Sequence, residues 1–410
     1  MLESWGRYPR PERQDELRAD WRDQPLPGAR PLLPYGKGRS YGDCCLNEGG
    51  ALVRTEGLDR FIALDASGVL RCEAGVTLGE ILALGVPKGW FLPVVPGTKQ
   101  VTVGGAIAND IHGKNHHRKG TFGAHVRRLE LLRSDGRVEC GPGDPLFAAT
   151  VGGLGLTGLV TWAELQLHPV PGPAVRVESV PFRTLAEFFE LSEASDAGFE
   201  YTVAWVDALR PGRGVLFRGD HADGAVRPPM PPLEVPVELP LVNGLSIRAF
   251  NLAYGAAQRR RSKLLHFDPF FFPLDRVRHW NRLYGKRGFL QFQCVVPGGE
   301  HLQALFEACR GQASALGVLK KFGGAASPGL CSFPRPGFTL ALDFKNNGDE
   351  TFRLFERLER TAIEAGGAIY PAKDARMSKA SFAASFPRLE ELEKLRDPAF
   401  SSSLWRRCAS

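Results

Sequence analysis

The chain has 410 residues, of which 43% are hydrophobic and 24% are charged. These proportions are typical of a soluble globular protein that is long enough for two domains with ordinary cores. The 52 basic and 45 acidic residues give a formal net charge of +7, a mild excess that favours an anionic ligand or a membrane surface. No basic block with interleaved aromatic residues occurs, so the sequence argues against nucleic-acid binding.

The eight cysteines are scattered, and none of them shows the CxxC spacing of a zinc site or a redox motif. We therefore expect reduced thiols, most of them buried. The first twenty residues lack the apolar core of a signal peptide, and no run of 18 uncharged apolar residues occurs. The expected location is cytoplasmic, with a peripheral contact at the inner membrane face left open.

Up to residue 168 the sequence consists of short β-rich runs separated by glycines. One segment, "VTLGEILALGVPKGW", predicts a helix. Thr77 is the expected N-cap, Glu80 stands three residues later as in a capping box, and Gly85 marks the expected end. Strands are predicted within residues 51–57, 68–75, 126–140 and 158–170.

From about residue 175 the predicted strands and helices become longer and alternate in two βαβ-like halves. This order predicts an antiparallel sheet backed by helices, and hence an α+β fold. Residues 222–244 contain six prolines without periodicity, which predicts a long surface loop that is either a lid or a mobile insertion.

Two motifs are rejected from their context. Gly153, Gly155 and Gly158 have the GxGxxG spacing of a dinucleotide fold, but the residues that follow alternate like a strand and not like a helix. His112 and His116 have a spacing that would suit a metal ion on a helix, but Gly113 and the lack of an acidic or Cys partner argue against it. No metal site is expected, and His116 and His117 are interpreted as structural.

Two glycine-rich stretches, "GKGRSYGD" at 36–43 and "PGTKQVTVGGAIANDIHG" at 96–113, offer small side chains and bare backbone N–H groups. Such groups form anion-binding concavities that suit a diphosphate. Either the two loops hold one extended diphosphate cofactor, or they are two ordinary glycine turns.

These stretches, together with "GTFGAHV", "TVGGLGLTG", "FFFPLDRVRHWNRLYGKRGFLQFQ", "KKFGG" and "IYPAKDAR", resemble the vanillyl-alcohol oxidase superfamily over nearly the whole chain. The resemblance implies a two-domain fold of the PCMH type. It implies an FAD-binding domain at 1–174, a substrate domain with an antiparallel sheet and helices at 175–366, and a C-terminal segment at 367–410 that returns to the FAD domain.

The resemblance also implies the cofactor site. Related oxidases often attach the flavin through a His at the position of Arg39, and arginine cannot form that bond, so noncovalent FAD is expected. The implied FAD-binding residues are Gly38, Arg39, Ser40, Tyr41, Gly42, Gly97, Thr98, Gln100, Val101, Thr102, Gly105, Ala108, Ile111, His112, Gly113, Asn115, Gly158 and Tyr370.

Flavin-dependent oxidation of an alcohol needs a base and a cation near the reacting carbon. His112, Lys373 and Tyr41 are the catalytic candidates, and the choice between His112 and Lys373 as the base stays open. In residues 337–345 the strand period turns Thr339, Ala341 and Asp343 to one face. The candidate substrate-binding residues are Lys114, Phe271, Gln291, Gln293, Lys320, Thr339, Ala341 and Lys373.

Two positions depart from the resembled sugar oxidases, which carry a Cys at Ala341 and a Tyr at Phe271. The leading hypothesis is oxidation of a secondary alcohol of a sugar, or of a polyprenyl-phosphate sugar, to a ketone, with a separate reductase completing a 2'-epimerisation. The alternatives are an alditol or aldonolactone oxidase that uses dioxygen, and a flavin-binding accessory protein without catalysis.

Overall fold

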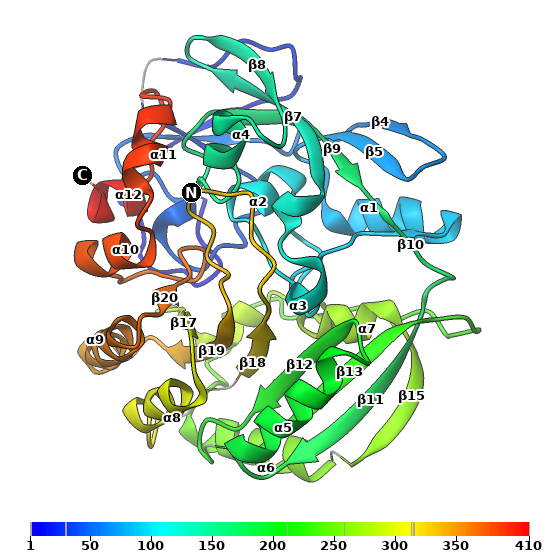
Figure 1. Ribbon diagram of the computed structural model, residues 1–410. Helices are drawn as coiled ribbons and strands as arrows, with labels where there is room; N and C mark the ends of the chain where they lie inside the picture. The colour runs from blue at the N-terminus through cyan, green and yellow to red at the C-terminus, as the bar shows by residue number, and fades with distance from the viewer. Residues whose placement is uncertain are drawn as a thin grey trace.

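The computed structural model describes residues 2–28, 31–210, 212–257, 259–312, 314 and 316–409. The sheets form two groups in space (Figure 1). Two sheets from the first 166 residues lie in the upper half of the figure, and one large sheet lies in the lower half. Mixed helices and antiparallel sheets confirm the predicted α+β class.

The upper half contains a five-stranded antiparallel sheet in the order β4-β5-β9-β7-β8. Its strands are β4 (Phe61–Leu64), β5 (Val69–Glu73), β9 (Leu159–Gln166), β7 (Val126–Arg133) and β8 (Gly136–Cys140). A parallel three-stranded sheet, β1-β3-β2, stands beside it. Its strands are β1 (Asp15–Arg18), β3 (Ala51–Arg54) and β2 (Leu32–Tyr35).

Two local predictions in this half are confirmed. Helix α1 (Leu78–Gly85) begins at Thr77, whose side chain accepts from the Glu80 N–H while the Glu80 carboxylate accepts from the Thr77 N–H. The glycine motif at 152–158 is a turn that leads into β9, because Gly152, Gly155 and Gly158 have positive φ angles and no helix begins there. The fold therefore supports rejecting a GxGxxG dinucleotide site.

The lower half is an eight-stranded sheet in which every described pairing is antiparallel. Its order is β15-β11-β13-β12-β18-β19-β17-β20. The strands are β15 (Arg261–His266), β11 (Ala174–Phe182), β13 (Gly214–Ala222), β12 (Tyr201–Val206), β18 (Gly317–Phe322), β19 (Gly337–Lys345), β17 (Phe289–Val296) and β20 (Ala368–Ile369).

The two faces of this sheet differ in character. Helices α5 (Leu185–Asp196), α8 (Gly299–Ala308) and α9 (Asp349–Glu364) cover one face and share a hydrophobic core with it. Leu290, Phe292, Cys294, Leu340, Leu342 and Phe344 point into this core from β17 and β19. The period of two therefore turns the alternate residues of both strands to the opposite face, as the sequence predicts.

The C-terminal segment leaves the large sheet after β20 and packs against the upper half. Helix α12 (Ser403–Cys408) contacts residues 43–45, and α11 (Leu389–Leu395) contacts α4 (Pro145–Thr150). The sequence after Gly367 predicts a strand that includes Tyr370 and Lys373, and this prediction is wrong. Strand β20 ends at Ile369, and both residues belong to a tight turn in which the Lys373 N–H donates to the Tyr370 carbonyl.

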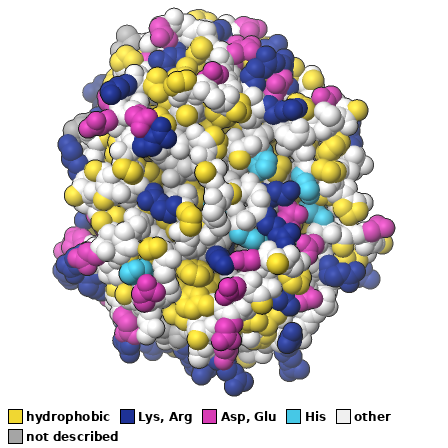
Figure 2. Space-filling view, viewed as in Figure 1, with side chains coloured by type: hydrophobic (Ala, Val, Ile, Leu, Met, Phe, Trp, Pro, Cys, Tyr) yellow, Lys and Arg dark blue, Asp and Glu magenta, His cyan; other side chains and the backbone are white. Residues whose placement is uncertain are grey.

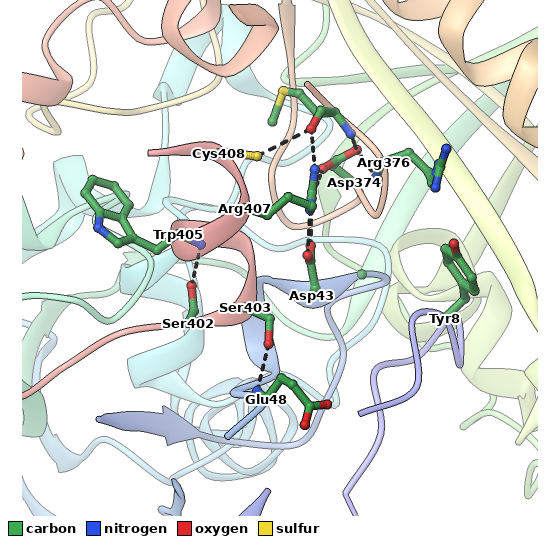
Figure 3. Close-up of polar contacts among 12 residues, drawn as sticks. Tyr8, Asp43, Glu48, Asp374, Arg376, Ser402, Ser403, Trp405, Arg407 and Cys408 are labelled. Atoms are coloured by element: carbon green, nitrogen blue, oxygen red, sulfur yellow. Dashed lines mark hydrogen bonds and ion pairs between the residues drawn. The ribbon is translucent and has the colours of Figure 1, made fainter. Parts of the chain in front are cut away.

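One ion-pair network fixes this segment to the first glycine-rich loop (Figure 3). Arg407 on α12 donates two hydrogen bonds of 2.8 Å to the Asp43 carboxylate and one of 2.8 Å to Asp374. Asp43 follows Tyr41 by two residues, and Asp374 follows Lys373 by one. The guanidinium thus ties together the two turns that carry the catalytic candidates Tyr41 and Lys373.

Residues 222–244 run mostly without regular structure, as predicted, apart from the short strand β14 (Leu233–Glu234). They lead into helix α6 (Gly244–Ala257). Among the described helices, none is long and apolar enough to cross a membrane.

Candidate active site

A cavity of about 1440 Å³ lies between the two groups of sheets. Its walls come from both glycine-rich loops, from the uncovered face of the eight-stranded sheet, and from the turn at 370–373. The volume exceeds the range of about 300–1,000 Å³ that is usual for pockets of small ligands. The cavity can therefore accommodate a dinucleotide together with a second molecule.

Most of the predicted site residues line this cavity. The cofactor candidates that do so are Gly38, Arg39, Ser40, Tyr41, Gly97, Thr98, Gln100, Val101, Thr102, Gly105, Ala108, Ile111, His112, Gly113, Gly158 and Tyr370. The substrate candidates that do so are Lys114, Gln291, Gln293, Lys320, Thr339, Ala341 and Lys373.

Three candidates lie outside the lining. Gly42 is packed against the Asp374 carbonyl so closely that no Cβ would fit. The Asn115 amide is buried and donates to the Pro93 carbonyl at 2.8 Å. Phe271 is fully buried in a core that the five-stranded and the eight-stranded sheets share, where its ring lies 4.7 Å from that of Tyr201.

Phe270, next to Phe271, lines the cavity instead. Helix α7 (Phe267–Phe271) places consecutive aromatic residues on different sides, so only one of the two reaches the cavity. The position that departs from the resembled oxidases is therefore a core position in this chain.

The glycine-rich loops form a cradle that fits FAD. A Cβ on Gly36 would collide with the Thr102 side chain, so the two loops approach closely only because Gly36 has none. Gly97 is different, because no protein atom lies within 4 Å of the position of its Cβ. Bare backbone of this kind lets an anionic diphosphate come close to N–H groups.

Charged groups flank the cradle. Asp275 accepts from the Thr98 hydroxyl at 2.6 Å and from the Lys99 N–H at 2.8 Å, which fixes the second loop. The Arg39 guanidinium lies 4.3 Å from the centre of the Trp5 ring, and its buried Nε has no partner among the described residues. A buried donor without a partner is costly, so this cation is available to a ligand atom.

The turn at 370–373 brings Lys373 to Tyr41. The Lys373 ammonium lies 3.5 Å from the centre of the Tyr41 ring, and the Tyr41 N–H donates to the Ala372 carbonyl at 2.8 Å. Burial lowers the pKa of Lys373 to about 7, although the Asp343 carboxylate acts in the opposite direction. Lys373 can therefore exchange a proton near neutral pH.

Asp343 stands opposite Gln291 on the neighbouring strand and accepts a short hydrogen bond from its amide. The other carboxylate oxygen, Oδ2, is buried without a partner among the described residues. Burial raises the pKa of Asp343 to about 7. Asp343 and Lys373 therefore each shift the pKa of the other in the direction that favours its charged form.

His112 is held by a side-chain amide. Gln293 Nε2 lies 3.0 Å from His112 Nε2 and also donates to the Thr339 hydroxyl at 3.2 Å. With the amide placed this way His112 Nε2 accepts, and His112 Nδ1 is buried without a partner among the described residues. Burial lowers the pKa of His112 well below its usual value, and the nearby Lys320 adds to this. The imidazole is therefore neutral, with its basic nitrogen already engaged.

Lys114 and Lys320, together with Lys373, contribute positive charge to the inner wall of the cavity. Lys114 donates to the Phe271 carbonyl at 3.1 Å, and burial together with Lys320 lowers its pKa to about 7. Burial alone lowers the pKa of Lys320 to about 8. Its neighbour Lys321 points elsewhere and forms an ion pair with Asp196 at 2.5 Å. The strand period thus decides which of the two adjacent lysines belongs to the site.

Several cavity residues were not among the sequence predictions. These are Trp5, Lys99, Asn109 and Asp275. Lys99 and Asn109 lie in the glycine-rich stretch 96–113 and Asp275 in the stretch 270–293 that carries the resemblance, whereas Trp5 lies in no motif. Asn109 is the acceptor for Tyr370, whose hydroxyl donates to its carbonyl at 3.0 Å. Asp343 also lines the cavity, and the sequence signal for it is the strand face that it shares with Thr339 and Ala341.

Comparisons with known proteins agree with this geometry. Residues 9–141 match the family model described as an FAD binding domain. Decaprenylphosphoryl-beta-D-ribose oxidase of Mycolicibacterium smegmatis is 36% identical over 413 residues, which cover 93% of this chain and 89% of the relative. An uncharacterized protein in the mprA 5'region of Streptomyces coelicolor is 36% identical over 81% of this chain and 99% of its own length. Alditol oxidase of a Streptomyces species is 31% identical over only 29% of each chain.

The matched domain and the cradle define the class: the protein is an FAD-dependent oxidoreductase. Its likeness to the ribose oxidase extends through both groups of sheets. The chain belongs to the vanillyl-alcohol oxidase family.

Proposed function

We propose that the protein oxidises a secondary alcohol of a polyprenylphosphoryl ribose, or of a closely similar lipid-linked sugar, to a ketone. The observation that carries the proposal is the convergence of Lys114, Lys320 and Lys373 with Gln291 and Gln293 in one cavity. The ammonium groups of Lys114 and Lys320 suit a phosphate, Lys373 is left for the proton chemistry, and the neighbouring amides suit the hydroxyls of a sugar. The name of the M. smegmatis relative points to the same substrate class.

We propose further that FAD is held without a covalent bond. Arg39 occupies the position at which related oxidases use a His, and a guanidinium cannot form that linkage. The domain boundaries proposed are 1–174 for the FAD domain, 175–366 for the substrate domain and 367–410 for the returning segment. Support comes from the sheets, since the strands of the eight-stranded sheet begin at Ala174 and the last of them ends at Ile369.

When bound, FAD supplies the acceptor for the hydride that leaves the carbinol carbon. The chain supplies the proton chemistry and the positioning. Lys373 is the proposed base, because its lowered pKa allows the neutral amine near pH 7 and His112 Nε2 is already engaged by Gln293. Tyr41 holds the Lys373 side chain in place through its ring, and Asp343 sets the charge of the amine.

Two partners belong to this proposal. A separate reductase would convert the keto sugar onward and so complete a 2'-epimerisation. A lipid-linked substrate also requires contact with the membrane that contains it, at the periphery of the bilayer. The location proposed is therefore the cytoplasmic side of the inner membrane.

The test is the visible spectrum of the purified protein during anaerobic addition of polyprenylphosphoryl ribose. We expect the flavin absorbance to bleach, and acid precipitation to leave the chromophore in the supernatant. Bleaching by free alditols with rapid peroxide formation would instead support an alditol oxidase. A yellow protein that no sugar bleaches, and that is unaffected by Lys373→Ala, would support an inactive flavin-binding protein.

A further inference from the structure

Exposed apolar side chains are concentrated in one segment of the chain. Among the described residues, eight of the eleven exposed large hydrophobic side chains lie between residues 230 and 252. Monomeric soluble proteins rarely expose so many apolar side chains together unless something covers them. The eight are Met230, Leu233, Val237, Leu239, Leu241, Leu245, Phe250 and Leu252.

Helix α6 shows the same feature in its orientation. It buries Ile247 and Asn251, which are one turn apart, and so its opposite side faces outward. A surface helix normally carries polar residues on this side. Here the outward residues are Leu245, Arg248, Ala249, Leu252, Ala253 and Ala256.

Basic residues flank the apolar surface. Residues 227–263 contain six Lys and Arg against two acidic residues, Glu234 and Glu238. Glu238 forms an ion pair with Arg7 at 2.5 Å, so its charge is largely neutralised. Arg259, Arg260, Arg261 and Lys263 follow α6 directly and are exposed. Figure 2 shows Lys and Arg side chains along the lower edge of the molecule, where α6 lies in Figure 1.

The same segment forms the mouth of the cavity. Met230, Leu241, Ile247, Phe250 and Tyr254 line it together with residues of the eight-stranded sheet. The apolar surface therefore continues inward toward the lysines and amides of the site. A ligand with an anionic head and a long apolar tail would place its head beside the lysines and amides and its tail on the apolar surface.

We propose that residues 230–257 and 259–263 form a docking surface for an anionic lipid bilayer. This inference rests on the proposed function and names the surface that would admit its lipid-linked substrate. The apolar side of α6 and the proline-rich segment insert at the interface, and the basic residues after α6 contact acidic headgroups. The basic flank favours a bilayer over a second copy of this chain, because two such surfaces would bring like charges together.

The experiment uses the full-length, FAD-loaded protein and sedimentation with sucrose-loaded vesicles. One set contains phosphatidylcholine alone, and the other contains phosphatidylcholine with one third phosphatidylglycerol. We expect sedimentation with the anionic vesicles, weaker sedimentation with the neutral ones, and loss of both on replacing Leu245 and Leu252 by Asp. Arg259→Ser with Arg260→Ser should lower the partition coefficient for anionic vesicles about 25-fold, since each basic residue near the surface contributes about fivefold.

A matched control replaces Phe61 and Ile62 by Asp, because both are exposed apolar residues on β4. This variant should sediment like the wild type. Equal sedimentation of the Leu245/Leu252 variant and the wild type would overturn the proposal. A wild-type dimer that becomes monomeric in that variant, with no vesicle binding by either, would assign the surface to a second copy and overturn it as well.

Flavin bleaching by short-chain and long-chain substrates distinguishes a failure of the docking surface from a failure of the proposed function. A short-chain phosphoryl ribose dissolved in water should bleach the flavin of the Leu245/Leu252 variant at the wild-type rate, while a long-chain substrate in vesicles should not. If no phosphoryl ribose bleaches the wild type, the proposed function fails. If the short-chain substrate bleaches it but vesicles are not bound, only the docking surface fails.

Discussion

The Lys373 ammonium lies 3.5 Å from the centre of the Tyr41 ring, although the two residues come from opposite ends of the chain. The ring excludes water from one side of the amine and offers it a favourable cation–π contact. The contact fixes the position of Lys373, and burial lowers its pKa; these are the two properties needed in a base.

We expect Lys373→Met to retain FAD and to slow the anaerobic bleaching of the flavin by substrate about 10²- to 10⁴-fold, the usual contribution of a positioned base. Single-turnover absorbance measures this step separately from reoxidation. Lys321→Met is the control, because Lys321 is paired with Asp196 and does not line the cavity. If His112→Ala rather than Lys373→Met abolishes the reductive step, the imidazole is the base.

The rate at which substrate bleaches the flavin should depend on pH in the same way as the deprotonation of the Lys373 amine. The neutral form of Lys373 accepts the proton, so the rate should rise with pH through about 7, where its pKa lies. The Asp343 carboxylate raises that pKa, and Asp343→Asn should therefore shift the midpoint of the profile to lower pH. A stopped-flow series between pH 5.5 and 9 tests this sign. A midpoint that moves to higher pH, or that does not move, would show that Asp343 does not raise the pKa of Lys373.

Binding of a phosphate-bearing ligand should take up protons. Lys114 and Lys320 have pKa values lowered by burial to about 7 and about 8, so both are partly neutral at pH 8. An anion beside them raises these values and restores the charged forms. Isothermal titration calorimetry at pH 8 in buffers of different ionisation enthalpy gives the number of protons. We expect the wild type to take up protons and Lys114→Met to take up fewer. Proton release by the wild type would show that these lysines do not become charged when the anion binds.

Strand alternation was the most informative feature of the sequence, because its period of two is set by the backbone alone. It turns Gln291 and Gln293 to one face of β17, and both line the cavity. The glycine-rich loops were informative for a similar reason, since Gly36 is required by a close approach to Thr102 that no other residue permits.

The features of the site that could not be predicted from the sequence have a common physical origin, because each depends on how segments meet in space. The sequence does not determine which of Phe270 and Phe271 reaches the cavity, since the orientation of a short helix is fixed by packing. Trp5 comes from a segment without a motif and reaches the site through tertiary contacts, and Asp275 is likewise positioned by its tertiary contact with Thr98. The turn at 370–373 was read as a strand because its residues follow a real one, β20.

Gly97 provides a test of the cradle that does not affect the fold. Its Cβ position has no neighbour within 4 Å, so Gly97→Val should fold normally while its side chain occupies space in the cavity. We expect the FAD dissociation constant to rise at least tenfold and the urea midpoint of the FAD-free protein to stay unchanged. Gly198→Val is the matched control, because Gly198 is equally open and does not line the cavity. Equal FAD affinity in both variants would show that Gly97 does not contact FAD.

Arg407→Met should lower the free energy of unfolding and should also weaken FAD binding and slow flavin bleaching. Asp43 and Asp374 would remain buried without their cation, and breaking a buried pair in this way costs about 3–5 kcal/mol in the free energy of unfolding.

Arg388→Met is the control for Arg407→Met, since its ion pair with Glu391 is exposed and such pairs contribute only about 0–1 kcal/mol. Urea denaturation followed by circular dichroism measures both variants. The turns that carry Tyr41 and Lys373 lose their common anchor, so FAD affinity and the rate of flavin bleaching should fall as well. A variant that loses stability but keeps the wild-type bleaching rate would show that the backbone contact between Tyr41 and Ala372 is sufficient to hold the site.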